Sequence, residues 1–223
     1  MGTSEDPGTP EGEEFTNRTA DARSGLLESA WGGPKSRDRI ARSAMRVRDV
    51  RWEDFSGLVD LYYTRYEEVK ENQELGILTK VTMPTLQEET GWFSGMYRQL
   101  LDGTAVACVA EEGDMIEGVC EVHPRGDHVE DSHVGVLGMV VRKESRGRGI
   151  GSALLENVLK ECRGRFEMIE LVVFSTNEKA KRLYERHGFR AWGISRKSLK
   201  RGGRYFDEVH MSLDLSTPES RGT

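Results

Sequence analysis

The chain has 223 residues, 36% of them hydrophobic, and its 32 basic and 38 acidic side chains give a formal net charge of −6. This acidic balance argues against a general nucleic-acid-binding protein, whose surface is usually basic, and no apolar run reaches the roughly 18 residues of a membrane span. The length allows one full domain of roughly 100–200 residues, and the low hydrophobicity indicates that part of the chain lies outside the folded core.

The first 44 residues differ in composition from the rest, since they hold three of the six prolines and one short apolar cluster. Such a segment buries too little apolar surface to offset the loss of chain entropy. We therefore expect a mobile extension over 1–44, with a transient helix over 22–31. Residues 45–215 are predicted to form one domain, and 216–223 a polar tail. Met45 opens the first strand pattern and is also a candidate for a later start of translation.

The first half of this domain is predicted to pair two helices with part of a sheet. An alternating pattern begins at Met45, and apolar residues then recur at helical spacing over 52–70 and 88–101. Short apolar runs between turn residues predict strands over 104–110, 115–123 and 134–141. The last of these runs is almost entirely apolar, so we expect that strand to be covered on both faces.

The second half alternates helices and strands and ends in a hairpin. We predict helices over 152–162 and 177–187, the second ended by Gly188, and strands over 169–174, 192–199 and 204–215. The order is β-α-α-β-β-β-α-β-α-β-β. This order predicts a domain of the α/β (α+β) class.

The cysteines and the N-terminus indicate the compartment. Three cysteines cannot all pair, and each lies in an apolar run, so we expect buried free thiols in a reducing environment. The N-terminus lacks the features of a secretory signal, and Asp6 stands where a myristoylation site needs Ser or Thr. We therefore expect a soluble cytoplasmic protein.

A glycine-rich loop joins the apolar strand at 134–141 to the next helix, and residues 146–151 read RGRGIG. The first amides of a helix have no partner within it and lie at the positive end of its dipole, where they bind anions. Glycines let the backbone approach phosphate oxygens, and Arg146 and Arg148 add positive charge. The segment fits neither a P-loop, which needs a lysine before Ser152, nor a dinucleotide fingerprint, whose third glycine comes one residue later.

This loop resembles the R/Q-x-x-G-x-G/A pyrophosphate loop of the GNAT superfamily, the acetyl-CoA-dependent N-acetyltransferases. A second segment begins at Asn177, reads NEKAKRLY and is followed by Gly188-Phe189. It resembles the family's N-x-x-A-x-x-L-Y-x-x-x-G-F helix. The order of elements agrees as well, so the resemblance covers about 45–215. It implies a single GNAT domain with a mixed, mostly antiparallel central sheet, splayed central strands and about four flanking helices.

The resemblance implies acetyl-CoA as cosubstrate. Its pantetheine arm would pair with the exposed backbone of Met139, Val140 and Val141, as an added strand does. Asn177 would reach the cofactor arm or serve only as a helix cap, and Ala180 would leave room for CoA. The pyrophosphate would bind the loop amides and the start of the helix, that is, Arg146, Gly147, Arg148, Gly149, Ile150, Gly151 and Ser152.

The resemblance also assigns catalytic roles. Tyr184 matches the general acid that protonates the departing CoA thiolate, although its spacing also suits a core tyrosine. A backbone N–H at Val140 or Val141 would stabilise the oxyanion. The amine must lose a proton, either to a water chain or to a base such as His133, Glu121 or, as a weaker candidate, Glu170. Each of these three also reads as an ordinary polar residue at a strand end.

Three histidines recur every five residues at 123, 128 and 133, but this spacing suits no known metal site, so we predict none. In the family, the first two helices, their connecting loop and the last hairpin build the acceptor groove. Aromatic and acidic residues there suit a small cationic amine, or else they are core residues and a solvated helix face: Tyr62, Tyr63, Tyr66, Glu67, Glu68, Glu71, Trp92, Phe93 and Tyr97.

We therefore expect an N-acetyltransferase acting on the primary amine of an amino acid or small amine by direct attack. One alternative is a protein N-terminal or lysine acetyltransferase, and another is a non-catalytic acyl-CoA-binding sensor module. The expected partner is a small-molecule or peptide amine, with no nucleic acid and no membrane. A homodimer is kept as an open alternative to a monomer.

Overall fold

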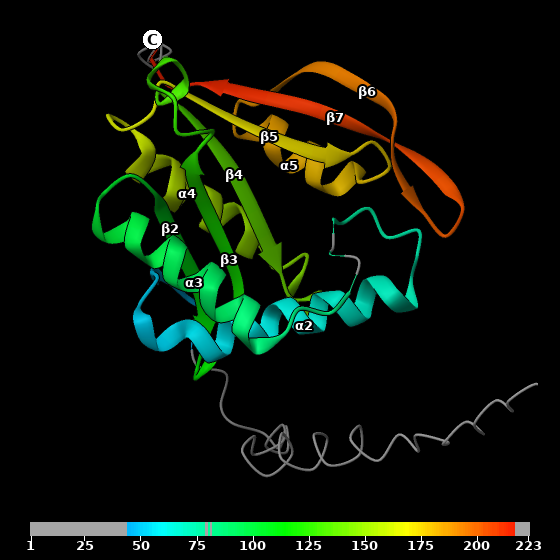
Figure 1. The fold of residues 1–223 in the computed structure, drawn as a ribbon, viewed down its shortest axis with the longest axis horizontal. Coiled ribbons are helices and arrows are strands. Elements are labelled where there is room, and N and C mark those ends of the chain that lie inside the picture. Colours follow the sequence, from blue (N-terminus) through cyan, green and yellow to red (C-terminus); the bar gives the residue numbers. More distant parts are fainter. Residues whose placement is uncertain (1–43, 79, 81, 217–223) are drawn as a thin grey trace, which may run out of the picture. The chain divides into compact units, whose positions relative to one another are not determined.

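The computed structural model describes residues 44–78, 80 and 82–216. Nearly all of the expected N-terminal extension, its helix over 22–31 and most of the C-terminal tail lie outside these residues. The described chain forms a seven-stranded sheet with the order β1-β2-β3-β4-β5-β7-β6 (Figure 1). None of its helices is both long and apolar enough to cross a membrane.

The sheet is mostly antiparallel. Strands β1 to β4 pair in sequence order, β7 pairs with both β5 and β6, and β4 and β5 form a parallel pair. The bounds are Arg46–Asp49 (β1), Val106–Glu112 (β2), Met115–Pro124 (β3), Val134–Val141 (β4), Met168–Phe174 (β5), Arg190–Arg201 (β6) and Arg204–Asp214 (β7).

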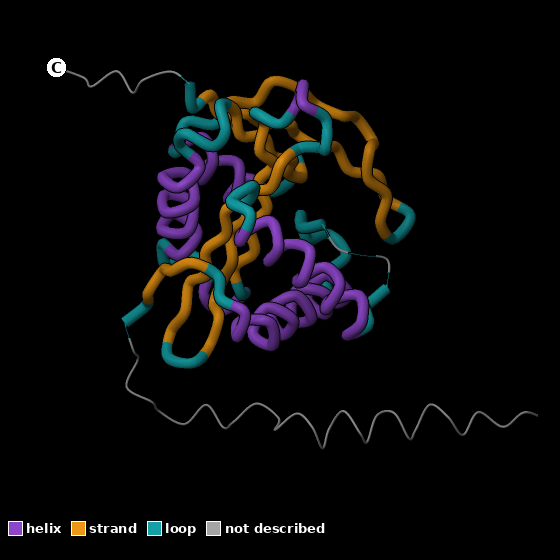
Figure 2. The backbone as a smooth tube through the Cα atoms, turned by 60° about the vertical axis from the view of Figure 1, so that its left-hand side comes forward, coloured by secondary structure: helices purple, strands orange, loops and turns teal. Residues whose placement is uncertain are grey.

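Two helices cover each face of the sheet. One pair comprises α2 (Phe55–Glu71) and α3 (Leu86–Leu101), and the other comprises α4 (Ile150–Cys162) and α5 (Glu178–Arg186). The two pairs lie on opposite sides of the strands (Figures 1 and 2). Single turns of 3-10 helix occur at Trp52–Asp54, Val129–Asp131 and Lys143–Ser145.

Each layer has its own apolar core, because alternate residues of a strand point to opposite faces. On the α2 and α3 side, Leu58 and Phe93 pack against Val109 and Val119. The other core holds Leu154 among its members and lies beneath α4 and α5. Burying one such side chain fully contributes about 1.5–3 kcal/mol, so the two cores hold the helices firmly on the sheet.

The parallel pair is short, and its strands then separate. Its register begins at Val134 opposite Met168 and ends at Val136 opposite Glu170, after three pairs. Beyond that point the remaining residues of β4 and β5 have no mutual pairing, and the two strands diverge (Figure 1). This confirms the expectation of splayed central strands.

The predicted order of elements is confirmed, and the strand predicted over 134–141 has those bounds. Most other boundaries differ by one or two residues, and the one that bears on the site is the start of α4, which lies at Ile150 rather than at Ser152. Its N-cap is Gly149, whose φ of 84° is a left-handed conformation that favours glycine. The three cysteines are free and buried, as expected.

Candidate active site between β4 and β5

A cleft of about 1350 Å³ follows the separation of β4 and β5. Its walls come from the end of β4 (137–141), the end of β5 (172–174), the glycine-rich loop, α5, α2 and the α2–α3 connection. The cleft is therefore bordered by helices from both faces of the sheet. A long ligand placed here would contact the free edge of β4 along its length.

The glycine-rich loop presents unpaired backbone amides to this cleft. Gly147 and Gly149 adopt positive φ values of 76° and 84°, which turn the chain before α4. Ala153 donates to the carbonyl of Gly149 (3.1 Å), and within the described chain no acceptor is found for the amides of residues 147–152. Gly147, Gly149, Gly151 and Ser152 line the cleft. Amides in this arrangement at a helix start bind anionic groups such as phosphate.

The side chain of Ser152 stands at the third position of α4. Its Oγ donates to Oε1 of Glu156 (3.2 Å) and lies 3.1 Å from Nε2 of His187. The hydroxyl thereby links α4 to the end of α5, where the expected pyrophosphate site borders the cleft.

Arg146 lines the cleft, but its charge is already paired. Its two terminal nitrogens donate to the two carboxylate oxygens of Glu68, each at 2.6 Å, and its Nε donates to the carbonyl of Val141 (3.0 Å). The bidentate pair joins the loop to α2, and Glu68 is buried there. Sequence reasoning placed Glu68 in the acceptor groove, whereas the structure shows it as the partner of Arg146.

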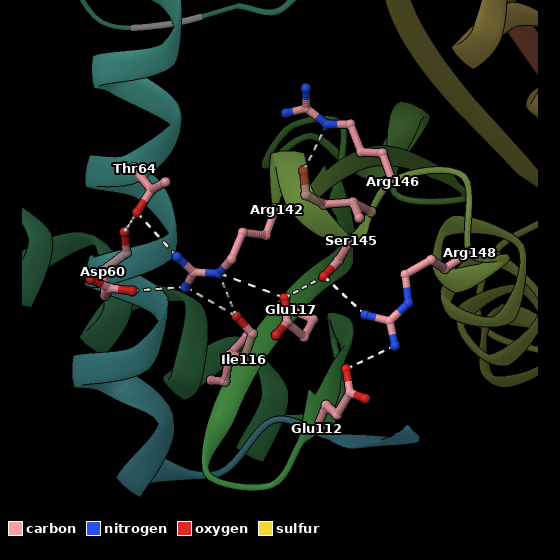
Figure 3. A network of polar contacts seen from close by, with 10 residues as sticks. Asp60, Thr64, Glu112, Ile116, Glu117, Arg142, Ser145, Arg146 and Arg148 are labelled. Carbon is pink, nitrogen blue, oxygen red and sulfur yellow. Dashed lines mark hydrogen bonds and ion pairs between the residues drawn. The ribbon is translucent and has the colours of Figure 1, made fainter. Parts of the chain in front are cut away.

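Arg148 was expected to add positive charge at the phosphate site, but the structure directs its side chain elsewhere. It points away from the cleft, donating to a carboxylate oxygen of Glu112 (2.8 Å) and to Oγ of Ser145 (3.4 Å) (Figure 3). Its guanidinium therefore does not add charge at the expected phosphate site. The turn at Gly147 sends Arg146 and Arg148 to different sides of the loop, which spacing alone could not reveal. The side chain of Ile150 is also buried in the core. Arg148 and Ile150 can therefore contribute only backbone groups to the expected phosphate site.

A buried polar network fixes the base of the loop (Figure 3). Arg142, which is 7% exposed, donates to Asp60 (2.7 Å) and Thr64 (3.1 Å) of α2 and to the carbonyl of Ile116. The network continues where Oγ of Ser145 donates to Glu117 of β3 at 2.6 Å. Because α2, β3 and the loop share these contacts, the amides before α4 are held in one position relative to the sheet.

The expected residues of the cofactor arm lie along the cleft. Met139, Val140 and Val141 line it, and one edge of each is already paired with β3, so the opposite edge faces the separated β5. Asn177 caps α5 by accepting from the amide of Ala180 (3.2 Å). It lines the cleft as well, and its Nδ2 donates to the carbonyl of Gly76 (2.9 Å), which ties α5 to the α2–α3 connection.

Tyr184 lies in the wall of the cleft formed by α5. Its ring packs against Phe189 with 5.7 Å between centroids, and the residue is buried. Burial raises the pKa of the hydroxyl above its ordinary value. The hydroxyl has no hydrogen-bond partner among the described residues, although it belongs to a residue that lines the cleft. A phenol in this state stays protonated and is available to donate a proton.

Glu121 enters the cleft from the face covered by α2 and α3. It is opposite Gly138 in the β3–β4 register, and its Oε1 lies 3.3 Å from where a Cβ on Gly138 would stand. A glycine at this position therefore leaves room for the carboxylate over β4. Desolvation raises the pKa of Glu121. A carboxyl with a raised pKa is better suited to accept a proton near neutral pH.

Two other candidate bases lie elsewhere. His133 is exposed at the start of β4, about 26 Å from Val141 by the rise of a strand, and it does not line the cleft. The sequence suggested His133 as a site residue because it directly precedes the apolar strand β4. At that end, however, β4 is still paired with β5, so no cleft opens beside His133. Glu170 is bound to Arg125 (3.4 Å) and is also outside the cleft.

The expected aromatic groove is partly core. Tyr62, Tyr66 and Trp92 line the cleft, whereas Phe93 is buried and packs with Tyr97. Glu67 and Glu71 are not among its lining residues. Helical spacing identified the right faces of α2 and α3 but could not separate cleft residues from core residues.

Sequence reasoning missed several charged cleft residues, among them one on α2 and one on α3. Arg65 and Glu89 line the cleft, and Glu89 is buried. A signal for Arg65 was present, because it follows Leu58 and Leu61 at helical spacing on the buried face of α2. Charged residues rarely occupy such a face unless they are paired or functional.

Comparison with known proteins agrees with this arrangement. A family model described as the acetyltransferase (GNAT) family matches residues 55–189. The L-amino acid N-acetyltransferase AaaT of Escherichia coli (strain K12) is 32% identical over 112 residues, which are 48% of this chain and 65% of that protein. The chain thus matches slightly less than two thirds of the length of this curated relative.

Solved structures share the fold. The phosphinothricin acetyltransferase of Sinorhizobium meliloti, solved in complex with acetyl-CoA, superimposes with a TM-score of 0.66 at 22% identity, covering 80% of this chain and 94% of that one. The ribosomal-protein-alanine N-acetyltransferase of Brucella melitensis has a TM-score of 0.66 at 23% identity, with coverage of 76% and 99%.

Proposed function

The chain belongs to the GNAT family of acetyltransferases, and on that premise we propose that it transfers the acetyl group of acetyl-CoA to the primary amine of an amino acid or another small amine. The observation that carries this proposal is the cleft itself. The free edge of β4, the unpaired amides before α4, Tyr184 and Glu121 all border the same space.

Acetyl-CoA fits this space as a substrate. The amides of the glycine-rich loop would bind its pyrophosphate, and the free edge of Met139 to Val141 would pair with the amides and carbonyls of its pantetheine arm. Arg182 and Arg186 also line the cleft along α5 and add positive charge for the remaining phosphate. A relative solved with acetyl-CoA supports this placement through its shared fold.

Glu121 and Tyr184 suit the two proton transfers of a direct acetyl transfer, one from the amine and one to the thiolate. The amine loses a proton to Glu121 and attacks the thioester carbon, so a C–N bond forms and the C–S bond breaks. Tyr184 gives its proton to the departing thiolate, and an amide of β4 stabilises the charge that develops on the carbonyl oxygen. Glu121 belongs to the face covered by α2 and α3 and Tyr184 to the other face, so base and acid approach from opposite sides of the sheet.

An acceptor screen tests the proposal. Thiol release from acetyl-CoA is followed with free amino acids, polyamines and short peptides as acceptors. We expect turnover with amino acids or other small amines and little with peptides. Preferred turnover of peptides would indicate the protein-acetylating alternative. Binding of acetyl-CoA with no turnover of any amine would contradict catalysis and favour a sensor module.

A further inference from the structure

The buried face of α2 carries a cation where an apolar residue is expected. Leu58 and Leu61 precede Arg65 at helical spacing, and Val69 follows it, all three apolar residues being at most 3% exposed. Arg65 is itself partly buried and lines the cleft. Its position in the helix is therefore that of a residue directed inward.

Arg65 lacks the ion pairs that Arg142 and Arg146 make with carboxylates of α2. Its Nε is buried without a hydrogen-bond partner, and within the described residues no ion pair involves it. Its guanidinium carbon lies over the ring of Tyr62, 4.8 Å from the centroid. By contrast, Arg142 and Arg146 are fully engaged with Asp60 and Glu68.

A partly buried cation without an ion pair is costly, since the carboxylates of Glu121 and Glu89 act on Arg65 only from a distance and offset its desolvation only in part. Burial lowers the pKa of Arg65, yet a guanidinium remains charged at neutral pH. Natural cores rarely keep such a group, and apolar replacements are usually as stable or more stable. The position of Arg65 is therefore better explained by an anion that binds in the cleft.

The surroundings of Arg65 place that anion at the acceptor end of the cleft. The charges that act on the guanidinium belong to Glu121 and Glu89, not to the glycine-rich loop. Tyr62 and Trp92 border the same region and stack edge to face at 4.9 Å. This part of the cleft thus offers the cation of Arg65, the carboxylate of Glu121 and an aromatic wall, which suits a small zwitterion, while Glu89 is already paired with Lys80 at 3.8 Å.

We infer that Arg65 binds the α-carboxylate of the acceptor, so that the substrates are free α-amino acids rather than simple amines. This inference rests on the proposed function. The guanidinium would grip the carboxylate by paired N–H···O bonds while Glu121 faces the amino group that attacks. Arg65 would then determine specificity at the site where the reaction occurs.

The test compares substrates that differ only in the carboxylate. L-Leucine, L-methionine and L-phenylalanine are each assayed beside their amide and their decarboxylated amine. Arg65→Met keeps the length and the helix propensity of the side chain without its charge, Arg65→Lys keeps a cation without the fork, and Arg98→Ala alters an exposed arginine of α3 as the control. Each rate is expressed relative to wild type on the same substrate, which cancels the intrinsic reactivity of the amine.

We expect Arg65→Met to lower kcat/KM for the amino acids on the order of 100-fold, as loss of a buried charge pair does. The amides and amines should be little affected, as should the KM for acetyl-CoA, and Arg65→Lys should retain part of the activity. The melting temperature of Arg65→Met should equal or exceed that of wild type. Equal losses on all three substrate types, or no loss on any, would overturn the inference.

A binding measurement separates this inference from the proposed function. Calorimetric titration of L-leucine, L-methionine and L-phenylalanine into the wild type with bound CoA should detect binding of the preferred acid, and Arg65→Met should abolish it. If such binding is present but no acceptor is acetylated, the carboxylate site stands and the proposed activity fails. If small amines are acetylated but the acids bind equally well to wild type and Arg65→Met, the activity stands and the inference fails.

Discussion

At the scale of single residues, the buried Tyr184 and the partly buried Glu121 are two titratable groups whose surroundings favour their protonated forms. Burial raises the pKa of both side chains, and neither makes an ion pair with a described residue. For the phenol this keeps a proton available to donate. For the carboxyl it moves proton uptake closer to neutral pH. The same desolvation therefore keeps the phenol protonated and makes the carboxylate a stronger base than it is in water.

Tyr184→Phe separates chemistry from stability. Removing the hydroxyl should lower kcat on the order of 10²-fold, a typical contribution of general acid catalysis, with little change in the KM for acetyl-CoA. Because the hydroxyl has no partner among the described residues, the melting temperature should not fall. Steady-state kinetics and thermal unfolding of the same sample check both expectations. An unchanged kcat would remove the acid role.

Glu121→Gln should change the pH profile. Wild-type kcat is expected to rise with pH through a pKa above the ordinary carboxyl range, because a base must be deprotonated and burial raises this pKa. The variant should lack that rise and be slower on the order of 10²-fold. A profile that keeps the rise in Glu121→Gln would indicate that water or another group accepts the proton.

The same carboxyl should influence stability in a pH-dependent way. Its folded pKa lies above its unfolded value, so its contribution to stability is present at low pH and is lost as pH rises through the folded pKa. Glu121→Gln should therefore unfold at nearly the wild-type temperature at about pH 4 and at a higher temperature at about pH 8. A lower melting temperature than wild type at the higher pH would show that the charged form is stabilised in the fold.

At the scale of elements, the start of α4 combines rigid support with unpaired amides. The network of Arg142 anchors the loop to α2 and β3, and the bidentate pair of Arg146 with Glu68 adds a second attachment. A preorganised set of donors does not need to be ordered when an anion arrives. The position of the loop amides thus depends on side chains whose charges are already paired within the protein.

Ser152 gives an electrostatic test of the proposed pyrophosphate site. Ser152→Asp places a negative charge in the first turn of α4, which suits the helix dipole but repels phosphate. We expect the Kd of Ser152→Asp for acetyl-CoA to rise at least about tenfold. Ser152→Asn is the matched control, because Asn has nearly the shape of Asp without its charge, and it should bind close to wild type. Calorimetry measures both. Equal affinities of the two variants would contradict anion binding at this helix start.

Removal of the anchor should affect stability. Arg142→Ala leaves Glu117, which is buried, without its positive partner, so we expect a loss of about 3–5 kcal/mol in the free energy of unfolding. Arg46→Ala breaks the exposed pair with Glu111 and should cost no more than about 1 kcal/mol. Urea unfolding of both variants compares them, and equal losses would show that the network does not anchor the loop.

The sequence predicted elements more completely than side-chain directions. Periodicity placed the helices and strands, since burial of one face of an element leaves a pattern in the sequence. It could not show that Arg148 leaves the cleft for Glu112, because this depends on a turn at Gly147 and on a residue 36 positions away. His133 was misplaced for a similar reason, since only the β4–β5 register shows which end of β4 is open.

At the scale of the whole molecule, an acidic chain holds a cleft with locally positive walls. The net charge of −6 describes the complete sequence, whereas the cleft combines backbone amides and the arginines of α5 at one end with Glu121 and Glu89 at the other. This separation suits a polyanionic donor at one end and an amine at the other. The gap between the diverging strands β4 and β5 joins these two ends of the cleft.

Label transfer tests this account most directly. The protein is incubated with acetyl-CoA carrying an isotope-labelled acetyl group and with the best acceptor of the amine screen, and the masses of the acceptor and of the intact protein are measured. Direct attack predicts label on the amine, none retained on the protein, and a strongly reduced yield with Tyr184→Phe. Label held covalently by the protein, or bound acetyl-CoA that never labels an amine, would contradict it.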